Sequence, residues 1–250
     1  MTIINFFWRG MRFGFLENIV LKSHIKVGHE PIVWLSGEKP QSSYWNDIEK
    51  KITVKNADFA DFKLSEFLVT GGDFRTAADL WRFHFLYSFG GIYCDTDAFA
   101  LKKFPDDEWI VCSAEKQPHM VSIGVLKAPP PLVSIGVLKA PPHHEIFLEC
   151  ISNVRKEWGN VQVFTDAYSK HFGHTNPTHD NKLFYPYRWH EWKKLFKKGK
   201  LPSNSYSVHF YGKMLEINLK ERLDDYNERW CERNPGTLLG KLWYWLQDKK

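Results

Sequence analysis

Two aspartates separated by one residue, Asp95 and Asp97, are the clearest sign of chemistry in this 250-residue sequence. They follow the apolar run Ile92–Cys94, which predicts a short buried strand, and the period-two geometry of a strand would direct both carboxylates to the same side. Mg²⁺ and Mn²⁺ accept carboxylate oxygens as ligands and complete their coordination with substrate phosphates. The pair therefore predicts a metal site for a phosphorylated substrate, and a solvated acidic turn is the alternative interpretation.

The segment before the two aspartates predicts the element that positions them. Its apolar spacing indicates a helix from Thr76, as the N-cap, to about Phe89, where a Gly-Gly pair ends it because glycine enters left-handed backbone without strain. Asp79 and Arg82 lie three residues apart on one face of this helix and could hold the hydroxyl groups of a polar ligand. A salt bridge between the two is the alternative.

Residues 79–97, DLWRFHFLYSFGGIYCDTD, closely resemble the D-x-x-R…L-Y-x-x-G-G-x-Y-x-D-x-D block of glycosyltransferase family 32, the transferases with a DXD sugar-binding region. That family includes yeast-type initiating mannosyltransferases and bacterial capsule and O-antigen transferases. The resemblance is tight over residues 77–101 and loose over residues 1–215. It implies a GT-A fold, a nucleotide-sugar donor such as a UDP- or GDP-hexose, a divalent metal (Mn²⁺ or Mg²⁺), and retention of the anomeric configuration.

The resemblance also implies roles for the residues of this block. The implied catalytic residues are Asp79, Arg82, Asp95 and Asp97. Asp97 would hold the metal, Asp95 would contact metal-bound water or the donor ribose, and the cation would neutralise charge developing on the diphosphate leaving group. The other two would orient the donor sugar. Front-face attack by the acceptor hydroxyl, with the donor phosphate taking its proton, would need no protein nucleophile.

Two runs outside the block add further candidates. INFFWRG is similar to the first strand of the family, where Trp8 matches a Trp that stacks on the donor base, and SYSVHFYGK is similar to a late strand that places His209 near the metal or the diphosphate. The Trp and the Ser-Trp pair that commonly follow this His are missing, and Lys213 could supply a charge instead. Both Trp8 and His209 could also be core residues. The implied metal ligands are Asp95, Asp97 and His209, and the implied donor-binding residues are Trp8, Tyr93, Asp95 and His209.

The remaining elements predict an α/β fold. Ile3–Trp8 and Pro31–Leu35 are short apolar strands, and Phe15–Val27 between them has helical spacing and ends at Gly28, which predicts a parallel βαβ unit. Together with the resemblance, this gives a GT-A type (Rossmann-like) fold with a mixed, mainly parallel central sheet flanked by helices. We expect a single domain over residues 1–250 with a basic helical tail at about 219–250.

Other segments carry weaker signals. Further expected elements are a strand at Trp109–Ala114, a helix at His143–Trp158, a loop at Thr165–Tyr187, a strand at Ser205–Tyr211 and an amphipathic helix from Leu238. VSIGVLKAPP occurs twice, at Val121–Pro130 and Val133–Pro142; one copy should pair as a strand while the remainder bulges at the surface. His171, His174 and His179 have ligand-like spacing but fall in the expected loop.

Composition places the chain among ordered globular proteins. Charged residues make up 25% and hydrophobic residues 43% of the sequence, which excludes a disordered tail and a membrane bundle. Aromatic residues reach 16% and either fill a core or line a site that stacks rings and sugars. The N-terminal apolar run is too short for a signal peptide, and four scattered cysteines form no zinc or redox motif, so a soluble, reduced, cytoplasmic protein is expected.

Positive charge is concentrated in the C-terminal third. The net charge is +5, and from Asn181 onward 15 Lys and Arg residues face 8 Asp and Glu residues. Lysines at 193, 194, 197, 198 and 200 alternate with apolar residues, and with the Trp-rich C-terminal tail they could rest on an anionic membrane surface. A solvated helix face is the favoured interpretation. Peripheral contact with the inner face of a membrane is the alternative, and nucleic acid is not an expected partner.

These observations favour a metal-dependent retaining hexosyltransferase of polysaccharide biosynthesis, acting from a nucleotide-diphosphate sugar onto a glycan or lipid-linked acceptor. One alternative is a phosphatase of the haloacid dehalogenase type, whose nucleophile is the first Asp of a D-x-D. That signature needs a Thr two residues after the second Asp, where this sequence has Phe99. A non-catalytic nucleotide-sugar binder is the other alternative.

Overall fold

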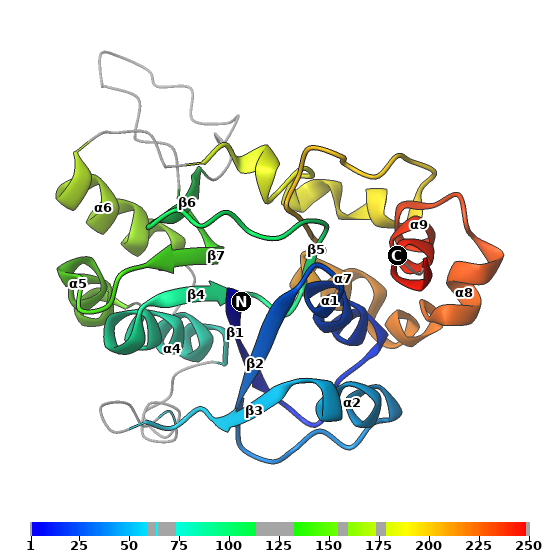
Figure 1. Cartoon of the computed structure of the whole chain (residues 1–250), viewed down its shortest axis with the longest axis horizontal. Helices are drawn as coiled ribbons and strands as arrows, with labels where there is room; N and C mark the ends of the chain where they lie inside the picture. Colours follow the sequence, from blue (N-terminus) through cyan, green and yellow to red (C-terminus); the bar gives the residue numbers. More distant parts are fainter. Residues whose placement is uncertain are drawn as a thin grey trace. The chain divides into compact units, whose positions relative to one another are not determined.

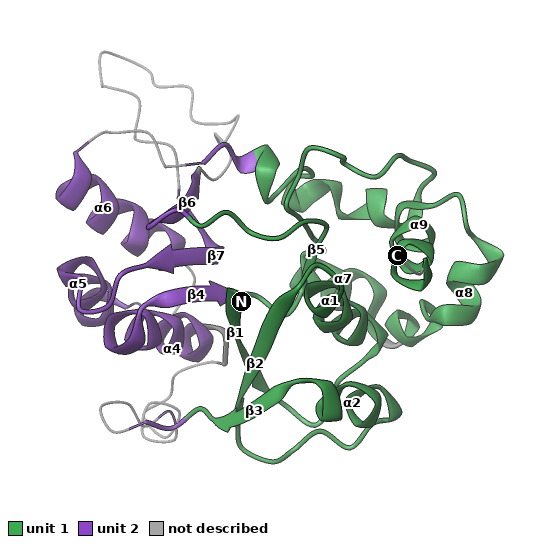
Figure 2. Ribbon diagram, in the orientation of Figure 1, with its two compact units in different colours: residues 1–57, 94–106, 182–250 green, residues 58–93, 107–181 purple. Residues whose placement is uncertain are grey.

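The computed structural model describes residues 2–59, 64, 74–113, 133–154, 160–173 and 179–248. The chain divides into two compact units, coloured green and purple in Figure 2. Unit 1 comprises residues 1–57, 94–106 and 182–250, and unit 2 comprises residues 58–93 and 107–181. The single domain expected over residues 1–250 stays a prediction.

Unit 1 opens with the expected parallel βαβ unit (Figure 1). Strand β1 (Thr2–Arg9) is followed by helix α1 (Phe15–Lys26) and strand β2 (His29–Ser36), and β1 pairs with β2 in parallel. Strand β3 (Thr53–Asn56) then pairs in parallel with β2. Gly28 adopts a φ of 86° just after α1, which is the left-handed conformation expected where the helix ends.

The later segments of unit 1 form a second, smaller sheet and a group of short helices. Strand β5 (Ala98–Ala100) pairs in antiparallel fashion with β8 (Ser207–His209), a shorter strand than the one expected at Ser205–Tyr211. The remaining α-helices of unit 1 are α2 (Ser43–Ile48), α7 (Gly212–Leu219), α8 (Glu228–Arg233) and α9 (Leu238–Gln247). Its 3-10 helices, labelled η, are η1 (Glu49–Lys51), η3 (Trp189–Phe196) and η4 (Lys220–Asp225). A further 3-10 helix, η2 (Asn181–Leu183), begins at the last residue of unit 2. The predicted C-terminal helix from Leu238 is confirmed.

Unit 2 consists of helices and strands from the middle of the chain. Its elements are α4 (Phe74–Phe89), β4 (Gly91–Cys94), β6 (Ile110–Ser113), β7 (Val133–Ala140), α5 (Glu145–Asn153) and α6 (Asn160–Phe172). The strands are ordered β4-β7-β6, with β6 antiparallel to β7. Helix α4 packs against α5, and α5 packs against α6. Parallel pairs in unit 1 and this antiparallel pair confirm the predicted mixed, mainly parallel α/β class.

Several predicted boundaries in unit 2 were wrong. The loop expected over Thr165–Tyr187 begins as helix α6, because its apolar residues recur at helical spacing and are buried: Val163, Phe164, Ala167 and Tyr168. Thr76 is not an N-cap, since α4 begins at Phe74. The second copy of the repeated decapeptide forms β7, as expected for one copy, and the first copy at Val121–Pro130 lies outside the described residues.

Aromatic side chains fill much of the described core. The largest fully buried side chains include Trp45, Trp81, Phe6, Phe13, Phe83, Phe99, Phe147 and Phe164. Most aromatic residues named here therefore contribute to packing rather than to a ligand site. Among the helices that the structure describes, none combines the length and the apolar character needed to span a membrane.

Candidate functional site

The two aspartates lie in a tight turn of unit 1. After Cys94, the Ala98 N–H donates to the Asp95 carbonyl at 3.1 Å, so residues 95–97 turn the chain instead of extending it. The expectation that period-two strand geometry aligns the carboxylates was therefore wrong. The turn itself brings the half-buried side chains of Asp95 and Asp97 toward a common partner.

That partner is His209, the last residue of β8. In the antiparallel pairing of β5 with β8, His209 lies opposite Ala98, next to the acidic turn. Its Nε2 is 3.0 Å from Asp97 Oδ1 and 3.5 Å from Asp95 Oδ2. One ligand atom from each of the three residues lies within 4.8 Å of the others, and the part of the chain that is described holds no second such group. Two candidates separated by more than a hundred residues are thus brought together within unit 1.

The backbone after His209 determines which ring nitrogen carries the proton. The Tyr211 N–H donates to His209 Nδ1 at 3.2 Å, so the neutral ring is protonated at Nε2, and this N–H donates to Asp97. Tyr211 has φ 56° and ψ 55°, a left-handed conformation uncommon outside glycine, and its hydroxyl donates to the Tyr187 carbonyl at 2.6 Å. His209 therefore presents a hydrogen-bond donor to the acidic turn.

Gly212 approaches Asp97 from the start of α7. Its N–H donates to Asp97 Oδ2 at 2.6 Å, and a Cβ at this position would lie 3.2 Å from the same oxygen, so glycine allows the close approach. Burial, together with the neighbouring Asp95, raises the pKa of Asp97, although His209 and the Gly212 N–H act in the opposite direction. Two carboxylates this close repel each other unless positive charge lies between them.

The donor set fits a divalent cation. Asp95 and Asp97 supply the oxygen ligands that Mg²⁺ and Mn²⁺ accept, and a cation would remove the repulsion between them. His209 can join as a third ligand through Nε2 only in its other tautomer, which loses the hydrogen bond from Tyr211 to Nδ1. The carboxylates therefore suit the predicted ligand role as they stand, whereas His209 suits the other predicted role, contact with a diphosphate.

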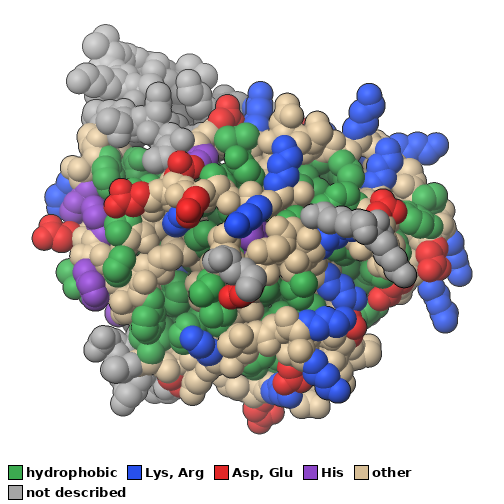
Figure 3. All heavy atoms as spheres, viewed as in Figure 1, with side chains coloured by type: hydrophobic (Ala, Val, Ile, Leu, Met, Phe, Trp, Pro, Cys, Tyr) green, Lys and Arg blue, Asp and Glu red, His purple; other side chains and the backbone are tan. Residues whose placement is uncertain are grey.

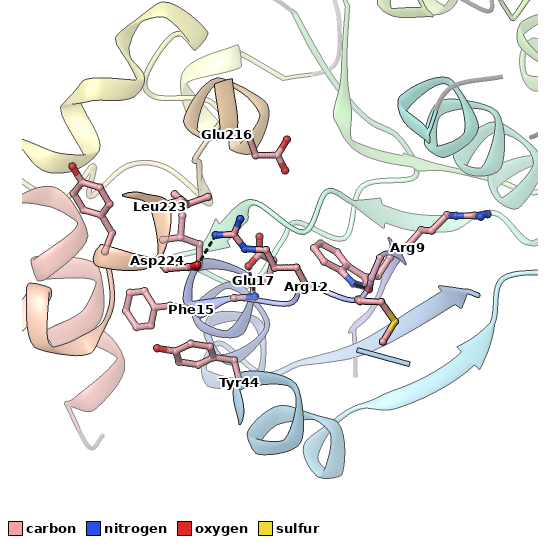
Figure 4. Close-up of a pocket in the computed structure, with 14 residues that line it drawn as sticks. Arg9, Arg12, Phe15, Glu17, Tyr44, Glu216, Leu223 and Asp224 are labelled. Carbon is pink, nitrogen blue, oxygen red and sulfur yellow. Dashed lines mark hydrogen bonds and ion pairs between the residues drawn. The ribbon is translucent and has the colours of Figure 1, made fainter. Parts of the chain in front are cut away.

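Trp8 lines a pocket of ≈370 Å³ in unit 1. Its indole N–H donates to the Gly10 carbonyl at 3.1 Å, and its ring meets Phe13 edge-on, with centroids 5.2 Å apart. Figure 4 shows Arg12 and Asp224 joined across part of this pocket by an ion pair of 2.6 Å. Other aromatic walls come from Phe15, Tyr44 and Tyr226. Trp8 is thus a half-buried pocket residue rather than a fully buried core residue.

Glu17 gives the same pocket a half-buried carboxyl group. Its Oε2 accepts the Gly14 N–H at 2.8 Å at the start of α1. Burial raises the pKa of Glu17, and the negative charge of Asp97 acts in the same direction. The charge of Asp97 in the acidic turn therefore acts on a carboxyl group of this pocket.

In unit 2, Asp79 and Arg82 form the salt bridge that was the alternative to ligand binding. Arg82 Nη2 lies 3.0 Å from Asp79 Oδ1, and Arg82 Nη1 donates to the Ile135 carbonyl of β7 at 2.6 Å. The guanidinium lies 4.5 Å from the ring centroid of Tyr93, and Asn160 Nδ2 donates to Asp79 Oδ2 at 3.1 Å. The pair and Tyr93 are thus held together inside unit 2, and their roles toward a donor stay predictions.

Some residues of these clusters carried no clear signal in the sequence. Tyr211 and Gly212 stood in the SYSVHFYGK run, but nothing there indicated a left-handed residue followed by a close backbone approach. Asn160 belongs to no motif, and only the packing of distant segments brings it to Asp79. Glu17 lies three residues after Gly14, the N-cap of α1, and this N3 spacing is the signal that could have indicated its contact with the Gly14 N–H.

The remaining candidates form no described site. His171 lies on α6 with its Nε2 3.1 Å from a Glu149 oxygen, while His179 pairs with Asp107 at 3.1 Å. His174 falls outside the described residues. All four cysteines are buried and free, which agrees with the reduced state expected from their scattered spacing.

Two family models match the chain. Residues 38–114 match the glycosyltransferase sugar-binding region containing the DXD motif, and residues 143–234 match the alpha 1,4-glycosyltransferase conserved region. Asp95 and Asp97 fall in the first matched region and His209 falls in the second, so the cluster joins residues from both. A comparison with curated protein sequences gave no match.

Solved glycosyltransferase structures show a weak likeness. The chain is 17% identical to the PaToxG glycosyltransferase, covering 68% of this chain and 69% of that chain, with a TM-score of 0.47. It is 13% identical to the glycosyltransferase GlyE of Streptococcus pneumoniae TIGR4, covering 98% of this chain but 63% of the GlyE chain, with a TM-score of 0.46. These likenesses are too weak to carry an argument, and the two sequence matches decide the assignment. The chain is a glycosyltransferase with a DXD sugar-binding region.

Proposed function

We propose that the chain is a metal-dependent, retaining glycosyltransferase that moves a hexose from a nucleotide-diphosphate sugar to a glycan or lipid-linked acceptor. The observation that carries the proposal is the Asp95–Asp97–His209 cluster, which joins the two matched regions in one place. Retention and the GT-A type rest on the resemblance of residues 79–97. A role in polysaccharide biosynthesis follows from the same resemblance. The cytoplasmic side of a membrane is proposed as its location from the composition and the basic C-terminal third.

In this proposal the acidic turn holds the metal and orients the diphosphate. Asp95 and Asp97 hold a divalent cation, Mn²⁺ or Mg²⁺, which when bound supplies positive charge against the charge developing on the leaving group. The Gly212 N–H keeps Asp97 in place. The His209 Nε2–H donates to Asp97 without a cation and would donate to a diphosphate oxygen once the cation holds that carboxylate. Each group acts from a fixed backbone position, so little reorganisation is needed during the reaction.

The donor nucleoside and sugar are assigned to separate residues. The pocket beside Trp8 is lined by aromatic rings and has room for a nucleoside, which supports a stacking role for Trp8 on the base. The resemblance supports Asp79 and Arg82 as residues that orient the donor sugar, with Tyr93 packed against the guanidinium. Attack by the acceptor hydroxyl on the same face as the leaving group, with the donor phosphate taking the proton, needs no nucleophile from the chain.

Hydrolysis of nucleotide-sugars without an acceptor tests this function. We expect one of a panel of UDP- and GDP-hexoses to release its nucleotide when Mn²⁺ or Mg²⁺ is present, with the rate lost on exhaustive chelation and regained when the cation returns. The anomeric configuration of the released sugar, followed by NMR at early times, should match that of the donor. Phosphate release from simple phosphoesters would instead support the phosphatase alternative. Donor binding without turnover would support the non-catalytic binder.

We also propose that a basic segment, residues 182–200, contacts an anionic membrane surface. Leu195 is buried and Phe196 packs on Tyr226 with centroids 4.1 Å apart, which fixes the segment to unit 1. Trp189 is 54% exposed on the same segment. The exposed cationic residues are Lys182, Arg188, Lys193, Lys194, Lys197, Lys198 and Lys200. Figure 3 shows Lys and Arg side chains projecting at the upper right, where Figure 1 draws this segment in yellow.

Charge reversal tests the membrane contact. Each lysine near an anionic surface contributes about 1 kcal/mol, and each glutamate in its place adds repulsion. The triple change Lys193→Glu, Lys197→Glu and Lys198→Glu should therefore weaken binding to phosphatidylglycerol vesicles by more than about a hundredfold. Sedimentation with these vesicles, compared with neutral phosphatidylcholine vesicles, measures the effect. As a control, the same reversals at the exposed Lys50, Lys51 and Lys55 should change binding far less. Equal losses from both triples would reject a specific surface.

A further inference from the structure

Strand β5 follows directly after Asp97 and has hydrogen bonds along both of its edges. Alternate residues of a strand direct their backbone groups to opposite edges. On the edge toward β8, the Phe210 N–H donates to the Asp97 carbonyl at 2.8 Å, and the Leu101 N–H donates to the Tyr206 carbonyl at 2.8 Å. This edge sets Asp97 beside the strand that carries His209.

Side chains of α1 form hydrogen bonds with the opposite edge of β5. The Ala100 N–H donates to Ser23 Oγ at 2.8 Å, and Ser23 in turn donates to the Val20 carbonyl at 2.6 Å. The Ala98 carbonyl lies 3.0 Å from His24 Nε2. The end of α1 therefore takes the place that a further strand would occupy, and β5 cannot shift without breaking these bonds.

A second histidine fixes the tautomer of the first. The Phe104 N–H donates to His29 Nε2 at 2.9 Å, so His29 carries its proton on Nδ1. His29 Nδ1 lies 2.9 Å from His24 Nδ1 and donates to it, which leaves the His24 proton on Nε2, directed at the Ala98 carbonyl. All four ring nitrogens are used, and both rings are neutral.

The surroundings favour these neutral rings. Both histidines are buried, and burial lowers the pKa of His24 to about 3 and that of His29 to about 4. Lys103 adds to the lowering for His29, and the other titratable group near His24 is the Cys94 thiol, with its sulfur 3.9 Å from Nε2. Phe6 and Phe104 pack edge-on against the His24 ring.

We propose that Ser23, His24 and His29 are positioning residues that hold β5, and through it Asp97, at the correct distance from His209. The inference rests on the metal site of the proposed function. These three side chains contact neither the acidic turn's carboxylates nor the proposed donor pocket, so they act through the β5 backbone and, for His24, through the Cys94 side chain next to Asp95. In metal sites, removing groups that hydrogen-bond directly to the ligands changes metal affinity by about 10- to 100-fold, and groups acting one contact further away are expected to have effects at the lower end.

Substitution of His24 tests the inference in the full chain. His24→Leu removes the donor to Ala98 and should weaken Mn²⁺ binding, measured by electron paramagnetic resonance of the free ion, about tenfold. His24→Gln keeps an acceptor and a donor at similar positions and should restore most of the affinity. Asn18→Ala, which removes bonds from α1 to Tyr44 and Asp47 but none to β5, should lower the melting temperature without changing Mn²⁺ affinity.

A measurement without metal tests the positioning role of His24 independently of whether the proposed site binds a cation. Long-range ¹H–¹⁵N spectra should show His24 protonated at Nε2 and His29 at Nδ1, and His24→Leu should shift the ring signals of His209. Unchanged His209 signals in folded His24→Leu would overturn the inference whether or not Mn²⁺ binds. A wild-type chain that binds no Mn²⁺, with His209 shifted in the variant, would reject the metal site alone. If His24→Leu does not fold, Ser23→Ala, which removes one of the two α1 bonds to β5, is expected to show smaller changes in the same direction.

Discussion

Replacing Asp97 by Asn is expected to lower the rate of metal-dependent sugar transfer about a thousandfold. The substitution removes one carboxylate from the pair that we propose holds the cation, while an amide oxygen can still accept the Gly212 N–H. Because burial and Asp95 raise the pKa of Asp97, its charge is not expected to stabilise the fold, and the variant should melt at or above the wild-type temperature. Initial rates with the preferred donor, together with thermal melts, measure both effects.

A control substitution at another aspartate separates the loss of the proposed metal ligand from a general loss of negative charge. Asp106→Asn removes an exposed carboxylate from the same stretch of unit 1 and should leave the transfer rate within about twofold of wild type. Full activity of the Asp97→Asn protein, or wild-type activity that survives exhaustive chelation, would rule out the proposed metal-dependent mechanism.

Acidification from pH 7 to pH 5 is expected to remove roughly 4 kcal/mol from the free energy of unfolding through His24 and His29 alone. Their pKa values are about 3 and about 4 in the folded protein, below the ordinary value of 6.5. Between these values the unfolded chain binds protons that the folded chain does not. The stabilisation is therefore complete above about pH 6.5 and is lost progressively as the pH falls toward 4. Urea unfolding at a series of pH values measures the slope.

The double variant His24→Gln with His29→Asn supplies the control for this effect. It removes both titratable rings and keeps polar groups in the cluster, so its unfolding free energy should change less than that of the wild type between pH 7 and pH 5. Equal slopes for the two proteins would show that His24 and His29 do not set the acid response between pH 7 and pH 5. The salt-bridged Asp47, with a pKa of about 2, contributes only at lower pH, because its carboxyl stays ionised in both states above about pH 5.

Local sequence signals were sufficient for the βαβ unit that opens the chain and for the activity class. The apolar spacing of α1 and the Gly28 stop gave its bounds to within a residue, and the βαβ order predicted the parallel pairing of β1 with β2. The D-x-D pair and the block before it also predicted the activity class that the two family matches show. These features depend on neighbours within a few residues, which a single sequence displays directly.

Helix α6 was missed because loop-forming residues around Gly173 and Pro177 outweighed a short apolar pattern whose burial depends on α5 and β7. The contacts that decide this helix come from residues distant in the chain, and local propensity is too weak to overrule them. The turn at residues 95–97 was also missed, although its Ala98 to Asp95 hydrogen bond is local, because the apolar run before it was extended through the acidic pair.

The sequence by itself therefore determined the activity class, the α/β fold and the identity of the acidic pair, because each is encoded in local spacing and residue type. The resemblance also placed His209 near the pair. Only the tertiary structure decided that the His209 Nε2–H is directed at Asp97, that the Tyr211 N–H sets the His209 tautomer, and that the Gly212 N–H holds Asp97. It also showed that Ser23 and His24 bond the strand behind the pair. Hydrogen bonds of about 3 Å between residues up to 115 positions apart form only when the whole unit packs, and no local pattern specifies them.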